Sequence, residues 1–210
     1  MKNTIGQVMR KTYAYWWVDG TMDMAMGLLF GGLAASNYLM GKLQLSEPWD
    51  LILAIAEPLL FVLFWFLYGR LMKWIKEHIT YRRTGYVAYQ PKKKKKRIQS
   101  AVIGGVMGIF TALMVTYIGP EVLKIEPMLI AGCVMAVITL YLGYWYGVNR
   151  FFIVAPVEFG LALWISSLSM DGELKSIAVM AAIGATWIIS GLATFILYLL
   201  RNRTSEEQEA

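Results

Sequence analysis

The sequence predicts an all-α membrane protein, a polytopic helix bundle of about six transmembrane helices with both termini on the cytoplasmic side. Three observations predict this class. Of the 210 residues, 58% are hydrophobic and the mean hydropathy is +0.52, whereas a soluble domain is about 45–50% apolar. The apolar residues gather in six long runs. Between these runs, Lys and Arg are alternately abundant and sparse.

Each apolar run is long enough for one helix to cross a bilayer. A hydrocarbon core about 30 Å thick requires about 20 apolar residues in helical form. A lone strand would leave its backbone groups unpaired in lipid, so we expect helices. The predicted spans are 20–40, 51–69, 99–118, 128–147, 151–169 and 177–199. We expect a single membrane domain over residues 1–200 and a disordered, Ser- and Glu-containing tail over 201–210.

The basic residues predict the orientation. Segments 1–19, 70–98, 148–150 and 200–210 hold three, eleven, one and two Lys or Arg residues, which is 17 of the 20 in the chain. These segments face the same side if the chain crosses six times. Positively charged flanks stay in the cytoplasm. We therefore expect a multi-pass protein of the cytoplasmic membrane with its long basic loop, residues 70–98, inside the cell.

Small residues indicate where helices pack closely. Glycines are spaced four apart at Gly27 and Gly31, at Gly104 and Gly108, and at Gly143 and Gly147. Such spacing lets two helix backbones approach each other, and we prefer packing within one chain to packing between chains. The fourth and fifth spans are joined by residues 148–150 alone, which predicts an antiparallel hairpin.

Three carboxylates are the charged residues of the six windows: Asp23, Glu57 and Glu158. An ionisable group inside a membrane is a functional candidate. Glu57 and Glu158 each lie about 10 Å from one end of their span, at 1.5 Å per residue. Each also lies next to or near a proline, Pro58 or Pro156, which removes a helix hydrogen bond. These carboxylates are candidates for an ion, proton or substrate path.

A structural role is the alternative, and we prefer it. A buried carboxyl group can be protonated and bonded to a neighbouring helix, paired with a cation, or neutralised by a basic side chain from the loop. The basic residues expected to reach the inner face are Arg70, Arg82, Arg83 and Arg150. Asp19, one helical turn before Asp23, is then a helix N-cap, and Asp23 pairs with an arginine.

The long loop offers two further candidate surfaces. A basic run, Lys92, Lys93, Lys94, Lys95, Lys96 and Arg97, adds about 1 kcal/mol of attraction to an anionic leaflet per charge. It is equally well explained as a topology determinant that binds nothing in particular. Guanidinium and phenol groups lie close together in sequence at Tyr81, Arg82, Arg83, Tyr86 and Tyr89, which suits a platform for lipid or a protein partner.

The start of this loop is predicted to remain helical. Residues 70–78 continue the second span, with Leu71, Trp74, Ile75 and His78 on one face. Beyond them, residues 79–89 are rich in β-branched and aromatic side chains around a Thr-Gly pair. This composition is typical of a short hairpin or an extended turn.

Enzymatic function is not expected. The sequence holds no GxxxxGK[ST], HExxH or GxSxG motif. It contains one His and one Cys, so we expect neither a metal nor a cofactor. Nucleic-acid binding is also not expected, because no recognised module surrounds the basic run.

Three short elements resemble an uncharacterised group of prokaryotic multi-spanning membrane proteins. The elements are Tyr15–Gly20, Ile79–Val87 (Ile-Thr-Tyr-Arg-Arg-Thr-Gly-Tyr-Val) and Ile189–Gly191 ahead of Arg201. The group's loop element has a proline between the tyrosine and the arginine, where this chain has Arg82. The resemblance implies a bacterial or archaeal inner-membrane protein and brings no activity with it.

The sequence therefore favours a non-enzymatic membrane protein whose basic cytoplasmic loop contacts anionic lipid or a partner protein, which includes a second copy of the chain. The alternative is a small transporter or channel-like protein, linked to protons or cations, that uses Asp23, Glu57 and Glu158.

Overall fold

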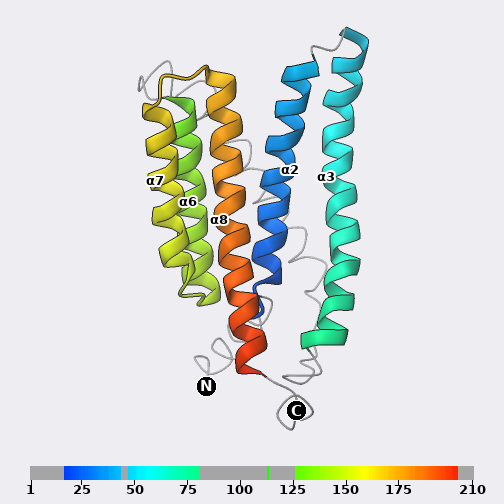
Figure 1. Cartoon of the computed structure of the whole chain (residues 1–210), viewed down its shortest axis with the longest axis vertical. Helices are drawn as coiled ribbons and strands as arrows, with labels where there is room; N and C mark the ends of the chain where they lie inside the picture. The colour runs from blue at the N-terminus through cyan, green and yellow to red at the C-terminus, as the bar shows by residue number, and fades with distance from the viewer. Residues whose placement is uncertain (1–16, 44–46, 81–112, 114–125, 203–210) are drawn as a thin grey trace. The chain divides into compact units, whose positions relative to one another are not determined.

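All regular structure in the described part of the chain is helical. The computed structural model describes residues 17–43, 47–80, 113 and 126–202 (Figure 1). The helices are α2 (Thr21–Leu43), α3 (Glu47–Ile75), α6 (Pro127–Tyr146), α7 (Phe151–Ser167) and α8 (Gly172–Arg201), and a π-helix, η1 (Lys76–Thr80), continues α3. The expected all-α class is confirmed. The predicted third span, 99–118, lies outside the described residues apart from position 113.

The helices form two compact units. The first spans Met1–Tyr86 and Gly172–Ala210, and the second spans Val87–Asp171. Helices α2, α3 and α8 belong to the first unit, and α6 and α7 belong to the second. The single membrane domain expected over residues 1–200 stays a prediction.

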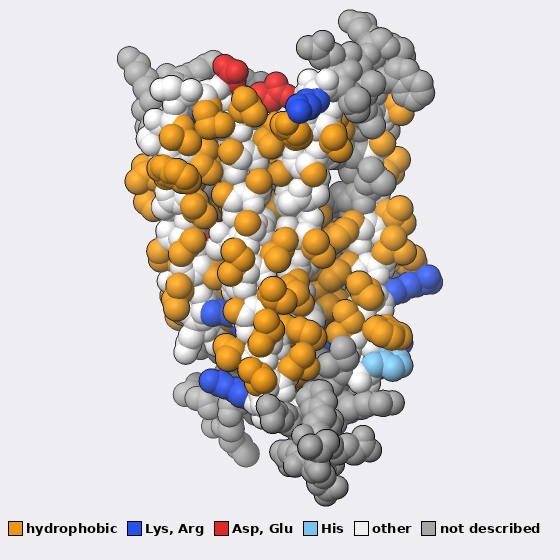
Figure 2. Space-filling model, viewed as in Figure 1, with side chains coloured by type: hydrophobic (Ala, Val, Ile, Leu, Met, Phe, Trp, Pro, Cys, Tyr) orange, Lys and Arg blue, Asp and Glu red, His pale blue; other side chains and the backbone are white. Residues whose placement is uncertain are grey.

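Within the described residues, three helices are long and apolar enough to cross a membrane: α2 over Thr21–Lys42, α6 and α8. Helix α7 is apolar but shorter, with 17 residues. Large apolar side chains point outward from these helices; Ile189 on α8 is 67% exposed and Ile153 on α7 is 71% exposed. Soluble monomers rarely expose contiguous apolar surface on this scale. Over the helices of the first unit, Figure 2 shows apolar side chains covering the middle of the face and charged ones near its ends.

Local sequence explains where the helices begin and end. Gly20 has φ +69°, a left-handed conformation that glycine adopts without a Cβ clash, and α2 begins directly after it. Asp23 lies in the first turn of α2, where the helix dipole favours negative charge. Pro127 opens α6, a position that needs no backbone N–H. Gly147 ends α6 in the left-handed conformation, with φ +71°.

Antiparallel helices α2 and α8 pack through glycines (Figure 1). A Cβ atom added at Gly27 would lie 2.6 Å from the carbonyl oxygen of Gly184, and one added at Gly191 would lie 2.7 Å from that of Gly20. Real Cβ atoms do not come this close, so the helix backbones require glycine here. The predicted close approach at Gly27 is confirmed, and its partner is in the same chain.

The second unit is an antiparallel hairpin of α6 and α7, as the short connection predicts. Gly132 faces Ala162, and a Cβ atom added at Gly143 would lie 3.0 Å from the Cβ of Phe151. The expectation that Gly147 shares in this packing is wrong. Gly147 is the C-cap, and nothing lies within 4 Å of its Cβ position. The predicted pair Gly104 and Gly108 lies outside the described residues.

Candidate functional site

The predicted helical continuation of the second span is confirmed. Helix α3 runs to Ile75 and η1 extends it to Thr80. Three side chains on one face of this extension, Tyr68, Met72 and Lys76, follow a four-residue spacing and so lie one above another. Met72 and Lys76 are each 2% exposed. A buried lysine requires a partner, because an unpaired buried charge is very unfavourable.

The partner of Lys76 is Asp19, which directly precedes the turn that opens α2. The Lys76 Nζ lies 3.1 Å from Asp19 Oδ2, and Asp19 is fully buried. The other carboxylate oxygen accepts hydrogen bonds from the Thr21 hydroxyl at 2.6 Å and from the Thr21 backbone N–H at 3.3 Å. Asp19 therefore satisfies a free N–H at the start of α2 and also neutralises a charge on the extension of α3.

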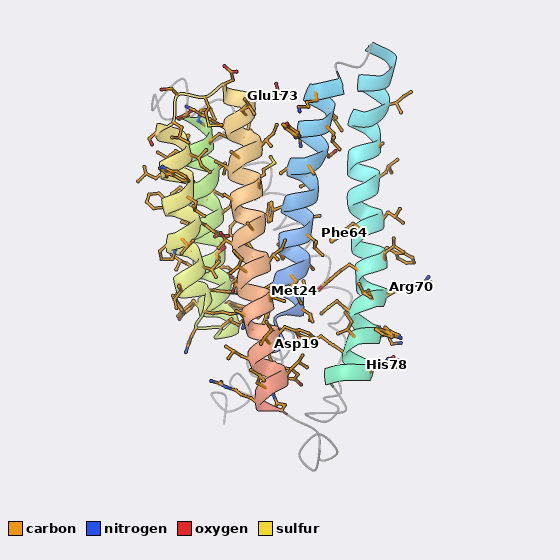
Figure 3. The ribbon with its side chains drawn as sticks, in the orientation of Figure 1. Asp19, Met24, Phe64, Arg70, His78 and Glu173 are labelled. Atoms are coloured by element: carbon orange, nitrogen blue, oxygen red, sulfur yellow. The ribbon has the colours of Figure 1, made fainter. Side chains whose placement is uncertain are left out.

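Tyr68 adds a second link between the same two elements. Its hydroxyl donates a hydrogen bond of 2.8 Å to the backbone oxygen of Thr21. The Tyr68 side chain also lies within electrostatic reach of both Asp19 and Asp23. Asp23 is fully buried. We call these five residues, Asp19, Thr21, Asp23, Tyr68 and Lys76, the polar cluster; Figure 3 marks its place at Asp19.

Aromatic packing fixes the turn before α2 onto α8. Trp17 is 7% exposed, and its ring centroid lies 6.2 Å from that of Trp187, which is 1% exposed. Two turns along α8 from Trp187, Thr194 faces Gly20. The start of α2, the end of α3 and the last turns of α8 thus meet at one end of the first unit.

The second unit also holds a fully buried carboxylate. Glu158 on α7 is fully buried, and its Oε2 accepts a 2.8 Å hydrogen bond from the Thr139 hydroxyl on α6. Pro156 lies inside the same helix without ending it. This hydrogen bond ties α6 to α7, and a hydroxyl partner is compatible with a structural role for Glu158.

The predicted site residues fall in different places. Asp23 belongs to the polar cluster in the first unit, and Glu158 belongs to the second unit. Glu57 lies within α3, but its side chain is outside those described. The candidate loop contacts also lie outside the described residues: Tyr81, Arg82, Arg83, Tyr86, Lys92, Lys93, Lys94, Lys95, Lys96 and Arg97.

The residue that neutralises Asp19 was not among those predicted. Arg70, one of the expected partners, is exposed and lies over the Phe66 ring instead. The partner of Asp19 is Lys76, and the arginine expected for Asp23 stays a prediction. A signal was present in the sequence: Lys76 lies eight residues after Tyr68 and on the face opposite Trp74 and His78.

The chemistry of the polar cluster is that of a buried ion pair with added hydroxyl donors. Within the described residues, no three His, Cys, Asp or Glu side chains are grouped closely enough to hold a metal ion. Comparison of the chain with protein-family models, with curated proteins and with solved structures finds no match.

Proposed function

We propose that this chain is a multi-pass protein of a prokaryotic cytoplasmic membrane, with six spans and both termini inside, whose basic loop holds anionic lipid headgroups. The observation that best supports this proposal is that the start of α2, the end of α3 and the last turns of α8 meet at one place. The ion pair between Asp19 and Lys76 joins the start of α2 to the end of α3. The contact of Gly20 with Gly191 brings the last turns of α8 to the same place.

Basic residues gather at this end. Helix α3 and η1 contribute Arg70, Lys73 and Lys76, and α8 ends with Arg201. The opposite end of the first unit, where α2 ends and α8 begins, carries fewer basic residues, Lys42 and Lys175, beside Glu173 (Figure 3 labels Glu173 there). Cytoplasmic flanks of membrane helices are enriched in Lys and Arg. The charge asymmetry supports a cytoplasmic position for the end that holds the polar cluster.

The loop that follows η1 then lies against the inner leaflet. It carries Lys92 to Lys96 and Arg97 in one run. Each of these charges adds about 1 kcal/mol of attraction to an anionic surface. A protein partner that contacts Tyr81, Arg82, Arg83 and Tyr86 is the competing use of the loop. Neither use involves a chemical reaction.

Lipid retention by matched charge variants tests this function. The triple variant Lys92→Gln, Lys94→Gln, Lys96→Gln removes three charges from the loop. The control Lys42→Gln, Lys124→Gln, Lys175→Gln removes three charges from the predicted outer side. Native mass spectrometry of purified protein titrated with phosphatidylglycerol measures the affinity. We expect at least a tenfold loss for the loop variant and a smaller loss for the control; equal losses would contradict the proposal.

Transport is a second candidate, and it is favoured by two fully buried carboxylates, Asp23 and Glu158. Carboxylates within transmembrane helices are typical of proton and cation paths. Protein in liposomes loaded with a pH-sensitive dye tests this function. Proton flux that is abolished by Glu158→Gln, by Asp23→Asn or by Glu57→Gln would favour transport. Absence of flux under proton and sodium gradients would leave lipid binding as the function.

A further inference from the structure

The face of α3 opposite the polar cluster carries a row of exposed aromatic and basic side chains. Phe66, Arg70, Trp74 and His78 are four residues apart in succession, and Lys73 lies beside them. We call these five residues the aromatic–cation stripe. Figure 3 shows Arg70 and His78 on the side of α3 that faces away from α2.

The side chains of the stripe are ordered by contacts with one another. The Arg70 Cζ lies 4.7 Å from the centroid of the Phe66 ring, within cation–π range. The rings of Trp74 and His78 stack with centroids 4.8 Å apart, and His78 Nδ1 lies 2.9 Å from the Trp74 backbone oxygen. Because these contacts restrict the rotamers, less conformational entropy remains to be lost when a ligand binds.

Arg70 lies at a boundary between apolar and polar surface. Its neighbours on the outer surface are large and apolar, with Phe66 57%, Leu67 54% and Leu71 52% exposed. Side chains on a helix lean toward its N-terminus, which for α3 is toward the apolar span. The position of the guanidinium over Phe66 agrees with this direction. The positive charge is therefore held at the edge of the apolar region instead of extending toward the loop.

No carboxylate in the described part of the chain pairs with Arg70. Lys73 does have a partner, Glu77, at 3.8 Å, but both side chains are well exposed, so this pair contributes little. The stripe thus presents a guanidinium that has no counter-ion among the described residues, flanked by apolar side chains on one side and by Trp74 and His78 on the other. A charge held at the edge of hydrocarbon requires an anion to be stable.

We propose that the aromatic–cation stripe binds the phosphate of one anionic phospholipid, with an acyl chain along Phe66 and Leu67. The planar guanidinium of Arg70 can donate two parallel hydrogen bonds to a phosphate. Indole rings such as Trp74 favour the headgroup level, where the ring is buried and the N–H is hydrated. This inference rests on the proposed function and assigns a specific lipid site outside the Lys92–Lys96 run.

A phospholipid fits this surface better than a protein partner. The exposed side chains on the apolar side of Arg70, including Leu63 at 49% and Phe66, belong to the predicted span 51–69, where lipid acyl chains surround the helix. The ligand must therefore combine an anionic group with a hydrocarbon tail. Charge and polarity together match a phospholipid, whereas free phosphate supplies the anion alone.

Native mass spectrometry of the delipidated full chain tests the site, with phosphatidylglycerol, phosphatidylcholine and inorganic phosphate as the probes. We expect tight binding of one phosphatidylglycerol, weaker binding of phosphatidylcholine, and no displacement by millimolar phosphate. Arg70→Gln should weaken phosphatidylglycerol binding about fivefold, and Arg70→Lys should restore part of the loss. The matched control, Arg201→Gln, removes a positive charge from the same end and should change binding less than twofold.

The outcomes separate this site from the basic run. Equal losses for Arg70→Gln and Arg201→Gln, or competition by inorganic phosphate, would overturn the proposed site. A loss with Lys92→Gln, Lys94→Gln, Lys96→Gln but none with Arg70→Gln would overturn the stripe and leave the proposed function standing. Capture of a protein that Arg70→Gln abolishes, without any lipid effect, would also overturn it.

Discussion

At the scale of single residues, the buried ion pair between Asp19 and Lys76 has the largest consequences. Two charges placed in a low-dielectric interior are stable only together, and loss of one leaves the other without compensation. The 2.6 Å hydrogen bond from Thr21 supports the same carboxylate. The pair therefore connects the turn before α2 to the extension of α3, through two residues that are 57 positions apart in the chain.

Replacement of Lys76 by methionine should destabilise the protein strongly. Lys76→Met keeps the approximate volume but leaves Asp19 buried without its cation, at a cost of about 3–5 kcal/mol. The double variant Lys76→Met, Asp19→Asn should recover part of this loss. Thermal unfolding in detergent, followed by circular dichroism, measures the change.

Lys73 supplies the control for this prediction. It lies on the same helix, but its side chain is 77% exposed and its pair with Glu77 is 3.8 Å long. Lys73→Met should therefore change stability by less than about 0.5 kcal/mol. If both lysine variants unfolded at the same temperature, the ion pair with Asp19 would not stabilise the first unit.

A second residue-scale prediction concerns Glu158. Thr139→Val removes the hydroxyl that donates to the buried carboxylate, and we expect a loss of about 1 kcal/mol. Thr186→Val is the control, because Thr186 donates within its own helix, to the oxygen of Ala182. Thermal unfolding of both variants tests this. A Thr139→Val variant as stable as the parent protein would contradict a stabilising link between α6 and α7.

At the scale of elements, bilayer-length apolar runs account for α2, α6 and α8, whose ends lie close to the predicted spans. Hydropathy and charge describe whole segments, and that is enough to predict a helix and its length. Hydropathy and charge do not specify how each helix is rotated about its own axis. The contacts of Gly27 with Gly184, and of Asp19 with Lys76, depend on that rotation. One feature of the sequence does indicate the rotation of α8: Gly184 and Gly191 are seven residues apart and so lie on the same helix face, the face that packs against α2.

Glycine substitutions test the crossing of α2 and α8. Gly27→Ala would place a Cβ atom 2.5 Å from the side chain of Ile188 and 2.6 Å from the backbone oxygen of Gly184. The overpacking should cost about 1–3 kcal/mol. Gly32→Ala is the control: nothing lies within 4 Å of its Cβ position, so better helix propensity should leave stability equal or slightly higher. Thermal unfolding of both variants measures the change in stability. A Gly27→Ala variant as stable as the parent protein would contradict the close approach of the α2 and α8 backbones.

At the scale of the whole molecule, alternation of segments rich and poor in Lys and Arg predicts the topology, and the joined ends of α2, α3 and α8 agree with it. Asp19 and the last turns of α8 meet at the basic end of the first unit. In the proposed topology, the polar cluster lies near the inner face of the membrane. The candidate lipid site on the opposite face of α3 lies at the same level, because Lys76 and Trp74 are half a turn apart.

Cysteine labelling in intact cells tests the membrane topology most directly. In a Cys133→Ser background, Lys42→Cys and Lys73→Cys mark the two ends of the first unit, and both positions are exposed. We expect a membrane-impermeant maleimide to label position 42 in intact cells and position 73 only after the membrane is permeabilised. Labelling of position 73 but not of position 42 in intact cells would contradict the account.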